Sequence, residues 1–111
     1  MTRTLLVLAV ATGVALAQAA TAAGDAEAGR EKAAACQQCH GIDGNGTTPQ
    51  FPKIGGQHAG YIVQALEDYK TGVRQDPVMA AFATGLSKQD REDLAAWYSS
   101  QDGLHTIKFD E

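Results

Sequence analysis

The sequence contains few basic residues. It has 9 Lys and Arg against 13 Asp and Glu, which gives a formal net charge of -4 at pH 7. Because binding to phosphate backbones requires clustered cations, this balance excludes nucleic-acid binding as a default expectation. An acidic surface either keeps a protein soluble or steers it toward a basic partner, and the composition leaves both interpretations open.

The sequence also lacks an apolar run long enough for a comfortable membrane span of about 20 residues. Its most apolar stretch, residues 5–17, follows Arg3 and precedes an A-x-A sequence at residues 20–22. These three features together are typical of a secretory signal peptide. We therefore predict a signal peptide over residues 1–23, one domain over residues 24–111 and a periplasmic location, with an uncleaved anchor as the less favoured alternative.

Cysteine occurs only at positions 36 and 39, so the chain has no disulfide framework outside this pair. With His40 the two cysteines form C-x-x-C-H, the attachment signature of a c-type haem. A thioredoxin-like dithiol would need a βαβ setting, which the surrounding sequence does not show. A structural zinc site would need four ligands, and the remaining histidines, His58 and His105, are scattered. The motif thus predicts one covalent haem c with His40 as an iron ligand.

Aromatic residues make up only 6% of the chain. The predicted mature domain of about 88 residues is long enough for one domain but provides a marginal core. A buried porphyrin would supply the missing apolar volume. We therefore expect the chain without its haem to be largely unfolded.

The apolar pattern predicts an all-α fold with three principal helices and no substantial sheet. The first helix is capped by Asp25 and runs through Ala33–Ala35 into Cys36. The second has Ile62, Ala65, Leu66 and Tyr69 on one face and stops at Gly72. The last begins at a capping box formed by Ser87 and Asp90 and ends near Gly103, followed by a polar tail through Glu111. Residues 41–56 form a long loop, and Met79–Ala83 forms a short helical or irregular segment.

The second axial ligand decides whether a haem carries electrons or binds small molecules. Met79 is the only methionine after the predicted signal peptide, and it follows a break that contains Pro77. We predict it as the distal ligand, although a lone methionine is often core filler. His58 is the competing candidate and would give bis-histidine ligation. A His/Met pair raises the reduction potential and fills both axial positions, which favours an electron carrier over an enzyme.

In four ordered segments the sequence resembles class I cytochromes c, and it is most similar to the monohaem cytochromes c553 and to one half of the dihaem cytochromes c4. The segments are Cys36–Gly46, Phe51–Gln57, Tyr61–Gly72 and Leu86–Gln101. The resemblance implies a class I cytochrome c fold, with loops and three helices wrapped around one haem. In that fold Gly29 and Ala33 of the first helix would pack against Leu94 and Trp97 of the last.

The same resemblance assigns roles to single residues. It implies thioether bonds from Cys36 and Cys39, His40 as proximal ligand and Met79 as distal ligand. The backbone carbonyl of Pro52 would accept the Nδ1 proton of His40 and so fix its tautomer. Further haem-pocket residues would be Ile54, Tyr61, Leu66 and Phe82, for which core packing alone is an equally good explanation.

The predicted function is that of a periplasmic one-electron carrier, not an enzyme, between a respiratory donor complex or dehydrogenase and a terminal oxidase or reductase. The alternative is an electron-accepting cytochrome subunit of a dehydrogenase complex, such as a sulfur-oxidising flavoprotein. A haem sensor or peroxidase is less favoured because it needs an open sixth position. We expect redox proteins as partners, no nucleic acid, no stable membrane insertion, and a monomer or weak dimer.

Overall fold

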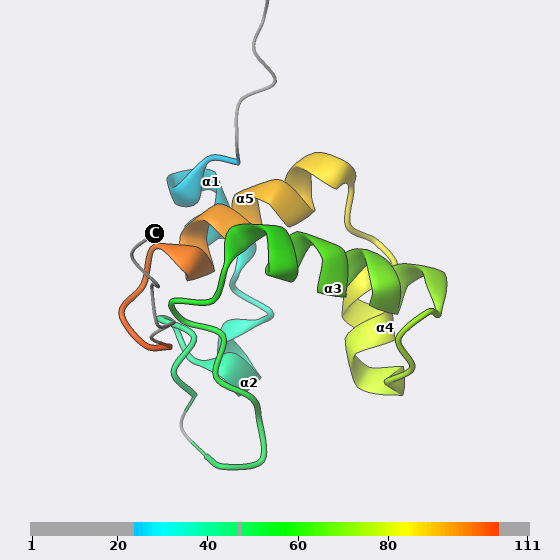
Figure 1. Cartoon of the computed structure of the whole chain (residues 1–111), viewed down its shortest axis with the longest axis horizontal. Coiled ribbons are helices and arrows are strands. Elements are labelled where there is room, and N and C mark those ends of the chain that lie inside the picture. Colours follow the sequence, from blue (N-terminus) through cyan, green and yellow to red (C-terminus); the bar gives the residue numbers. More distant parts are fainter. Residues whose placement is uncertain (1–23, 47, 105–111) are drawn as a thin grey trace, which may run out of the picture.

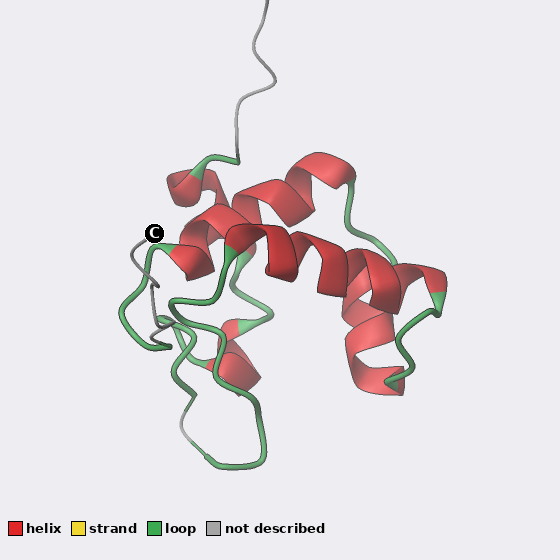
Figure 2. Cartoon of the chain, in the orientation of Figure 1, coloured by secondary structure: helices red, strands yellow, loops and turns green. Residues whose placement is uncertain are grey.

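The computed structural model describes residues 24–46 and 48–104, and all regular structure in this part of the chain is helical (Figures 1 and 2). The helices, in chain order, are α1 (Ala26–Lys32), α2 (Gln37–His40), α3 (Ala59–Thr71), α4 (Pro77–Ala83) and α5 (Lys88–Ser99). The predicted all-α class is confirmed. The predicted signal peptide, His105 and the polar tail lie outside the described residues.

Helices α1 and α5, which stand at opposite ends of the described chain, pack side by side (Figure 1). A glycine on α1 makes this possible, since a Cβ built on Gly29 would lie 1.9 Å from the backbone oxygen of Asp93. Next to this contact, Ala33, Ile62, Leu94, Ala95 and Tyr98 form the buried core cluster. The predicted pairing of the first and last helices is therefore present.

Local capping chemistry starts the helices where the sequence predicts. The Asp25 side chain accepts a hydrogen bond from the backbone of Ala28, 2.8 Å away. Ser87 and Asp90 form the reciprocal capping box at the start of α5. Gly72 follows α3 with φ of 80°, a left-handed conformation that glycine adopts without strain.

Two predicted helix boundaries are wrong. The first helix does not continue into Cys36, because α1 ends at Lys32 and the chain makes turns before α2 starts at Gln37. The last helix ends at Ser99, before Gly103. Its final turn is closed by two side chains, since Ser100 Oγ and Gln101 Nε2 both donate to the Trp97 carbonyl, at 2.7 and 3.0 Å.

An ionic cluster joins α1 to α5. Lys32 Nζ lies 2.9 Å from Asp90 Oδ1 and 2.5 Å from Asp93 Oδ2. The side chain of Asp93 is almost fully buried, and its other oxygen accepts hydrogen bonds from the Asp25 backbone and the Gln89 amide, each 2.8 Å away. The buried carboxylate is thus fully paired, as a charge in this position requires.

Helix α3 packs on α5 and also supports α4. It buries Ile62 and presents its more polar side to solvent. Within the described residues, no helix has the length and apolar composition needed to cross a bilayer.

Candidate functional site

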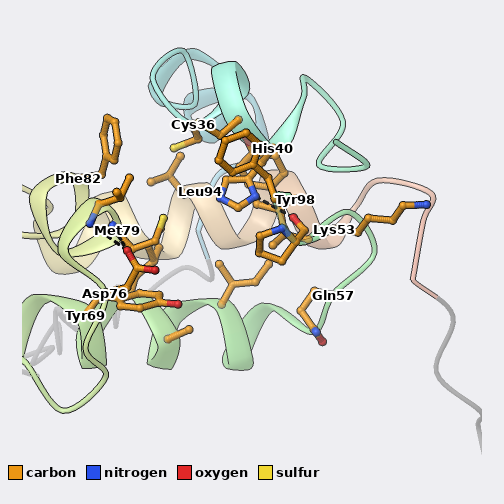
Figure 3. Close-up of a pocket in the computed structure, with 18 of the residues that line it drawn as sticks. Cys36, His40, Lys53, Gln57, Tyr69, Asp76, Met79, Phe82, Leu94 and Tyr98 are labelled. Atoms are coloured by element: carbon orange, nitrogen blue, oxygen red, sulfur yellow. Dashed lines mark hydrogen bonds between the residues drawn. The ribbon is translucent and has the colours of Figure 1, made fainter. Parts of the chain in front are cut away.

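A cavity of about 370 Å³ lies between α2, α3, α4 and α5 (Figure 3). All nine predicted haem-pocket residues line it: Cys36, Cys39, His40, Pro52, Ile54, Tyr61, Leu66, Met79 and Phe82. They come from segments up to 46 positions apart in the sequence (36 to 82). The fold therefore brings the whole predicted set to one place.

The short helix α2 carries the C-x-x-C-H motif to the cavity. Cys36 is its N-cap, Cys39 and His40 form its last two positions, and Gly41 ends it with φ of 80°. Both cysteines are half-buried, and neither is in a disulfide bond. Burial raises the pKa of the Cys36 thiol. One helical turn thus presents two thiols and an imidazole to the same cavity.

The imidazole of His40 is held by one hydrogen bond and is only 7% exposed. Its Nδ1 atom lies 2.9 Å from the Pro52 carbonyl oxygen, the contact implied by the resemblance. Because a carbonyl can only accept, Nδ1 carries the proton, and the lone pair of Nε2 is available to a metal.

The loop that carries Pro52 is fixed by two glycines. The backbone amides of Ile54 and Gly55 both donate to the Gly44 carbonyl, at 2.7 and 3.0 Å. Gly44 has φ of 77°, and a Cβ on it would lie 2.5 Å from Gly55 N. Only glycine fits this close approach, which sets the position of the Pro52 carbonyl relative to His40.

Met79 reaches the cavity from α4, on the side away from α2 and His40 (Figure 3). Asp76 caps this helix, because its side chain accepts hydrogen bonds from the backbones of Val78 and Met79, at 2.9 and 3.0 Å. Pro77 occupies the first helical turn, where its missing N–H costs nothing. The predicted irregular or helical segment is thus a capped helix that holds the thioether in place.

The competing ligand candidate does not reach this cavity. His58 is the exposed N-cap residue of α3 and is absent from the cavity lining. Among the described residues, the imidazole and thioether groups that line the cavity are those of His40 and Met79.

Several lining residues lie outside the predicted set. Leu94 and Tyr98, which the periodicity placed on the apolar face of the last helix, form part of the cavity wall. The Tyr98 hydroxyl is buried without a hydrogen-bond partner, and burial raises its pKa. The spacing of the two residues, one helical turn apart on α5, was the available signal that both face the same side.

Arg74 is a further lining residue and brings a positive charge to the cavity. Its Nη1 atom donates to the Tyr61 hydroxyl at 3.2 Å, and its guanidinium lies 4.8 Å from the centre of the Tyr69 ring. The hydrogen bond to Tyr61 raises the pKa of Arg74. The lining also includes Lys53 and Asp76, but most of the wall is apolar. A fixed cation at the edge of such a wall would favour a ligand that carries acidic groups.

The residues of this site fit a covalently attached haem. Two thiols, one imidazole and one thioether surround a single cavity whose wall includes Ile54, Leu66 and Leu94. Thiols at this spacing form thioether bonds, and the nitrogen and sulfur donors are those of the His/Met class of haem proteins.

Comparisons with known proteins identify the family of this chain. Residues 26–102 match the cytochrome c family. Cytochrome c4 of Pseudomonas aeruginosa is 49% identical over 82 residues, which are 74% of this chain and 41% of that protein. Cytochrome c-554(548) of Halomonas halodenitrificans is 43% identical over 83 residues, which are 72% of this chain and 100% of that protein.

A solved structure shares the fold. The reduced recombinant cytochrome c4 from Pseudomonas stutzeri superposes with a TM-score of 0.69 at 45% identity, over 74% of this chain and 48% of that one. The chain thus spans about half the length, or less, of the cytochromes c4 that it matches. The fold is that of a class I cytochrome c. The chain belongs to the cytochrome c family, and its cofactor is a covalently bound haem c.

Proposed function

We propose that this protein is a periplasmic one-electron carrier whose haem c is ligated by His40 and Met79. One observation carries the proposal: the imidazole and the thioether line opposite sides of the same cavity, next to both thiols (Figure 3). Bound haem c supplies a one-electron redox couple. The surrounding side chains hold the iron ligands in place and provide an apolar wall.

The ligand residues are arranged for stable coordination on both sides. Pro52 fixes the His40 ring and makes Nε2 a stronger donor. The Asp76 cap orders the turn that carries Met79. With both donors in place, small ligands must displace a protein group before they bind, which favours electron transfer over oxygen or peroxide chemistry.

The wall of the cavity excludes water from the coordination site. Ile54, Leu66 and Leu94 contribute aliphatic surface. A low-dielectric surrounding disfavours the more highly charged oxidised state, as does a neutral thioether ligand. The protein should therefore have a higher reduction potential than a bis-histidine form of the same chain.

The partners of such a carrier are redox proteins that donate and accept single electrons. The predicted signal peptide supports a periplasmic site of action. A donor complex or dehydrogenase would reduce the protein, and a terminal oxidase or reductase would oxidise it.

A second candidate function is that of an electron-accepting subunit in a dehydrogenase complex. Two relatives support it. One, from Stutzerimonas stutzeri, is named as a thiosulfate dehydrogenase electron acceptor and is 38% identical over 65 residues. The other, from Chlorobaculum tepidum, is named as the cytochrome subunit of sulfide dehydrogenase and is 35% identical over 65 residues. Purification from the native source separates the two functions, because a subunit would co-purify with a flavin-containing partner in fixed ratio.

Replacement of Met79 by Ala tests the ligand assignment. The thioether no longer stabilises the reduced state, so the reduction potential should fall by more than about 60 mV, a tenfold shift for a one-electron couple. The haem should stay attached, because both thioether bonds remain. A redox titration with absorption spectroscopy of both oxidation states measures these two properties.

The matched control is His58→Ala, which removes the competing ligand candidate from an exposed helix start. Its reduction potential should equal that of the wild type. If His58→Ala lowers or raises the potential and Met79→Ala leaves it unchanged, the His/Met assignment is wrong.

A further inference from the structure

Two cationic side chains from different helices converge on one backbone oxygen beside α4. Lys70 Nζ, in the last turn of α3, lies 2.6 Å from the Leu86 carbonyl oxygen. Arg91 Nη1, in the first half of α5, donates to the same oxygen at 3.1 Å. We name this arrangement the Leu86 clamp.

A third residue, Glu67 on α3, completes the clamp. Arg91 Nη2 lies 2.6 Å from Glu67 Oε2 on α3, as a close ion pair. The Arg91 side chain is only 10% exposed, whereas that of Glu67 is 39% exposed. A guanidinium this deeply buried needs its partners, because a lost partner leaves a buried charge uncompensated. The clamp therefore binds α3 and α5 to the same point of the chain.

That point lies directly after the helix that carries Met79. Leu86 follows the end of α4 by three residues, and its amide donates to the Ala83 carbonyl at 3.1 Å. Its side chain packs against the core cluster. Among the described helices, α4 packs against α3, whereas its backbone does not come close to that of α5. The Leu86 carbonyl is thus the point where α5 acts on the segment that follows α4.

We propose that Lys70 and Arg91 are positioning residues that hold α4, and with it the Met79 thioether, against the cavity. The inference rests on the proposed His/Met ligation. Movement of α4 would make displacement of Met79 easier, and the contacts that hold the Leu86 carbonyl from two sides restrict that movement at the C-terminal end of the helix. The clamp therefore sets how readily an external ligand replaces Met79.

Imidazole titration of the oxidised holoprotein tests the proposal, because imidazole binds only where Met79 leaves. Lys70→Met keeps the aliphatic stem and removes one donor, so imidazole should bind about fivefold more tightly, the effect of one lost hydrogen bond. Arg91→Lys keeps the charge but cannot contact both the Leu86 carbonyl and Glu67, so imidazole should again bind more tightly than to the wild type. Lys88→Met is the matched control, since Lys88 is 74% exposed, contacts Glu92 and makes no contact with Leu86.

The absorption band of the Met-ligated oxidised haem, followed in the same titration, reports on Met79 itself. Chemical unfolding of each variant is measured separately, so that an effect on global stability is distinguished from an effect on the ligand. The proposal predicts tighter imidazole binding by Lys70→Met at a temperature where all variants are fully folded, and wild-type binding by Lys88→Met.

Other results would contradict the clamp or the ligand assignment. Equal imidazole affinity of Lys70→Met and the wild type, or an equal gain in Lys88→Met, overturns the clamp. Equal affinity of Met79→Ala and the wild type instead shows that Met79 is no ligand, and the proposed function fails. Because Lys70 is an exposed residue at a helix end, its variant should fold even if Arg91→Lys does not.

Discussion

Gly29 shows how the absence of one side chain decides the packing of two helices. A Cβ at this position would lie 1.9 Å from Asp93 O and 2.9 Å from Trp97 Cβ. The first neighbour is backbone and cannot rotate away. The close approach of α1 to α5 therefore depends on this residue.

We expect Gly29→Ala to destabilise the protein by about 2 to 3 kcal/mol, the usual cost of forcing an extra carbon into a packed contact. The loss occurs although alanine is the better helix former by about 1 kcal/mol. Denaturant unfolding of the holoprotein measures the free energy of unfolding.

Gly60→Ala is the control for this prediction. Gly60 is also helical, on α3, but has no atom within 4 Å of its added Cβ. The same change should stabilise the protein by about 0.5 kcal/mol. Equal effects at the two glycines would show that helix propensity, and not the α1–α5 contact, determines the result.

The site residues that the sequence predicts without the family resemblance are those whose chemistry is local or distinctive. Cys36, Cys39 and His40 are adjacent in one motif, and Met79 is the only thioether after the predicted signal peptide. Tyr98 was predicted only as part of the apolar face of the last helix and was not assigned to the site. Its contribution depends on where α5 lies in space, and an aromatic residue on a helix face more often packs in the core.

At the level of helices, Lys32 links α1 to α5 through Asp90 and Asp93. The hydrogen bond from Lys32 lowers the pKa of Asp90 from 3.8 to about 2, and it lowers that of Asp93 as well. A carboxyl group whose pKa is lower in the folded state stabilises that state while it is ionised. Its contribution is fully present above about pH 4 and is lost as the pH falls toward 2.

We therefore expect Asp90→Asn to flatten the dependence of stability on pH between about 4 and 2. Asparagine keeps an oxygen for the Ser87 backbone, so the change isolates the charge. Urea unfolding at a series of pH values provides the slope. Glu31→Gln, which removes an exposed carboxylate next to Lys32, should keep the wild-type slope; if it flattens the slope equally, net charge alone explains the effect.

Helix starts were easier to predict than helix ends. Asp25 and Ser87 cap helices through their own side chains and the next turn, so the signal lies within four residues. The end of α5 depends instead on Ser100 and Gln101, whose side chains bond to the Trp97 carbonyl. Serine and glutamine are also common in loops, so their presence does not predict where a helix ends. The break after Lys32 reflects the need to turn the thiols toward the cavity, a tertiary requirement that an alanine-rich sequence does not show.

Over the whole molecule, the buried apolar residues are few and mostly small. In the described part they are Ala33, Ile62, Ala83, Leu94, Ala95 and Tyr98. Large apolar side chains such as Phe51, Tyr61, Val78 and Phe82 remain exposed although they line the cavity. The wall of the cavity is thus a core whose centre is provided by the haem.

We expect a Cys36→Ser/Cys39→Ser double variant, recovered without haem, to lose most of its helical circular dichroism signal. Without the porphyrin, the chain cannot bury enough apolar surface to offset its conformational entropy. Absorption spectroscopy must show that no haem is bound. A haem-free variant that kept full helicity and melted cooperatively would show that the protein core is sufficient by itself.

The pairing of α1 with α5 also makes the fold depend on both ends of the described chain. The helix that precedes the thiols packs against Lys88–Ser99, which lies far from it in the sequence. A chain that stopped before α5 would leave α1, and the turns that lead from it to Cys36, without their packing partner.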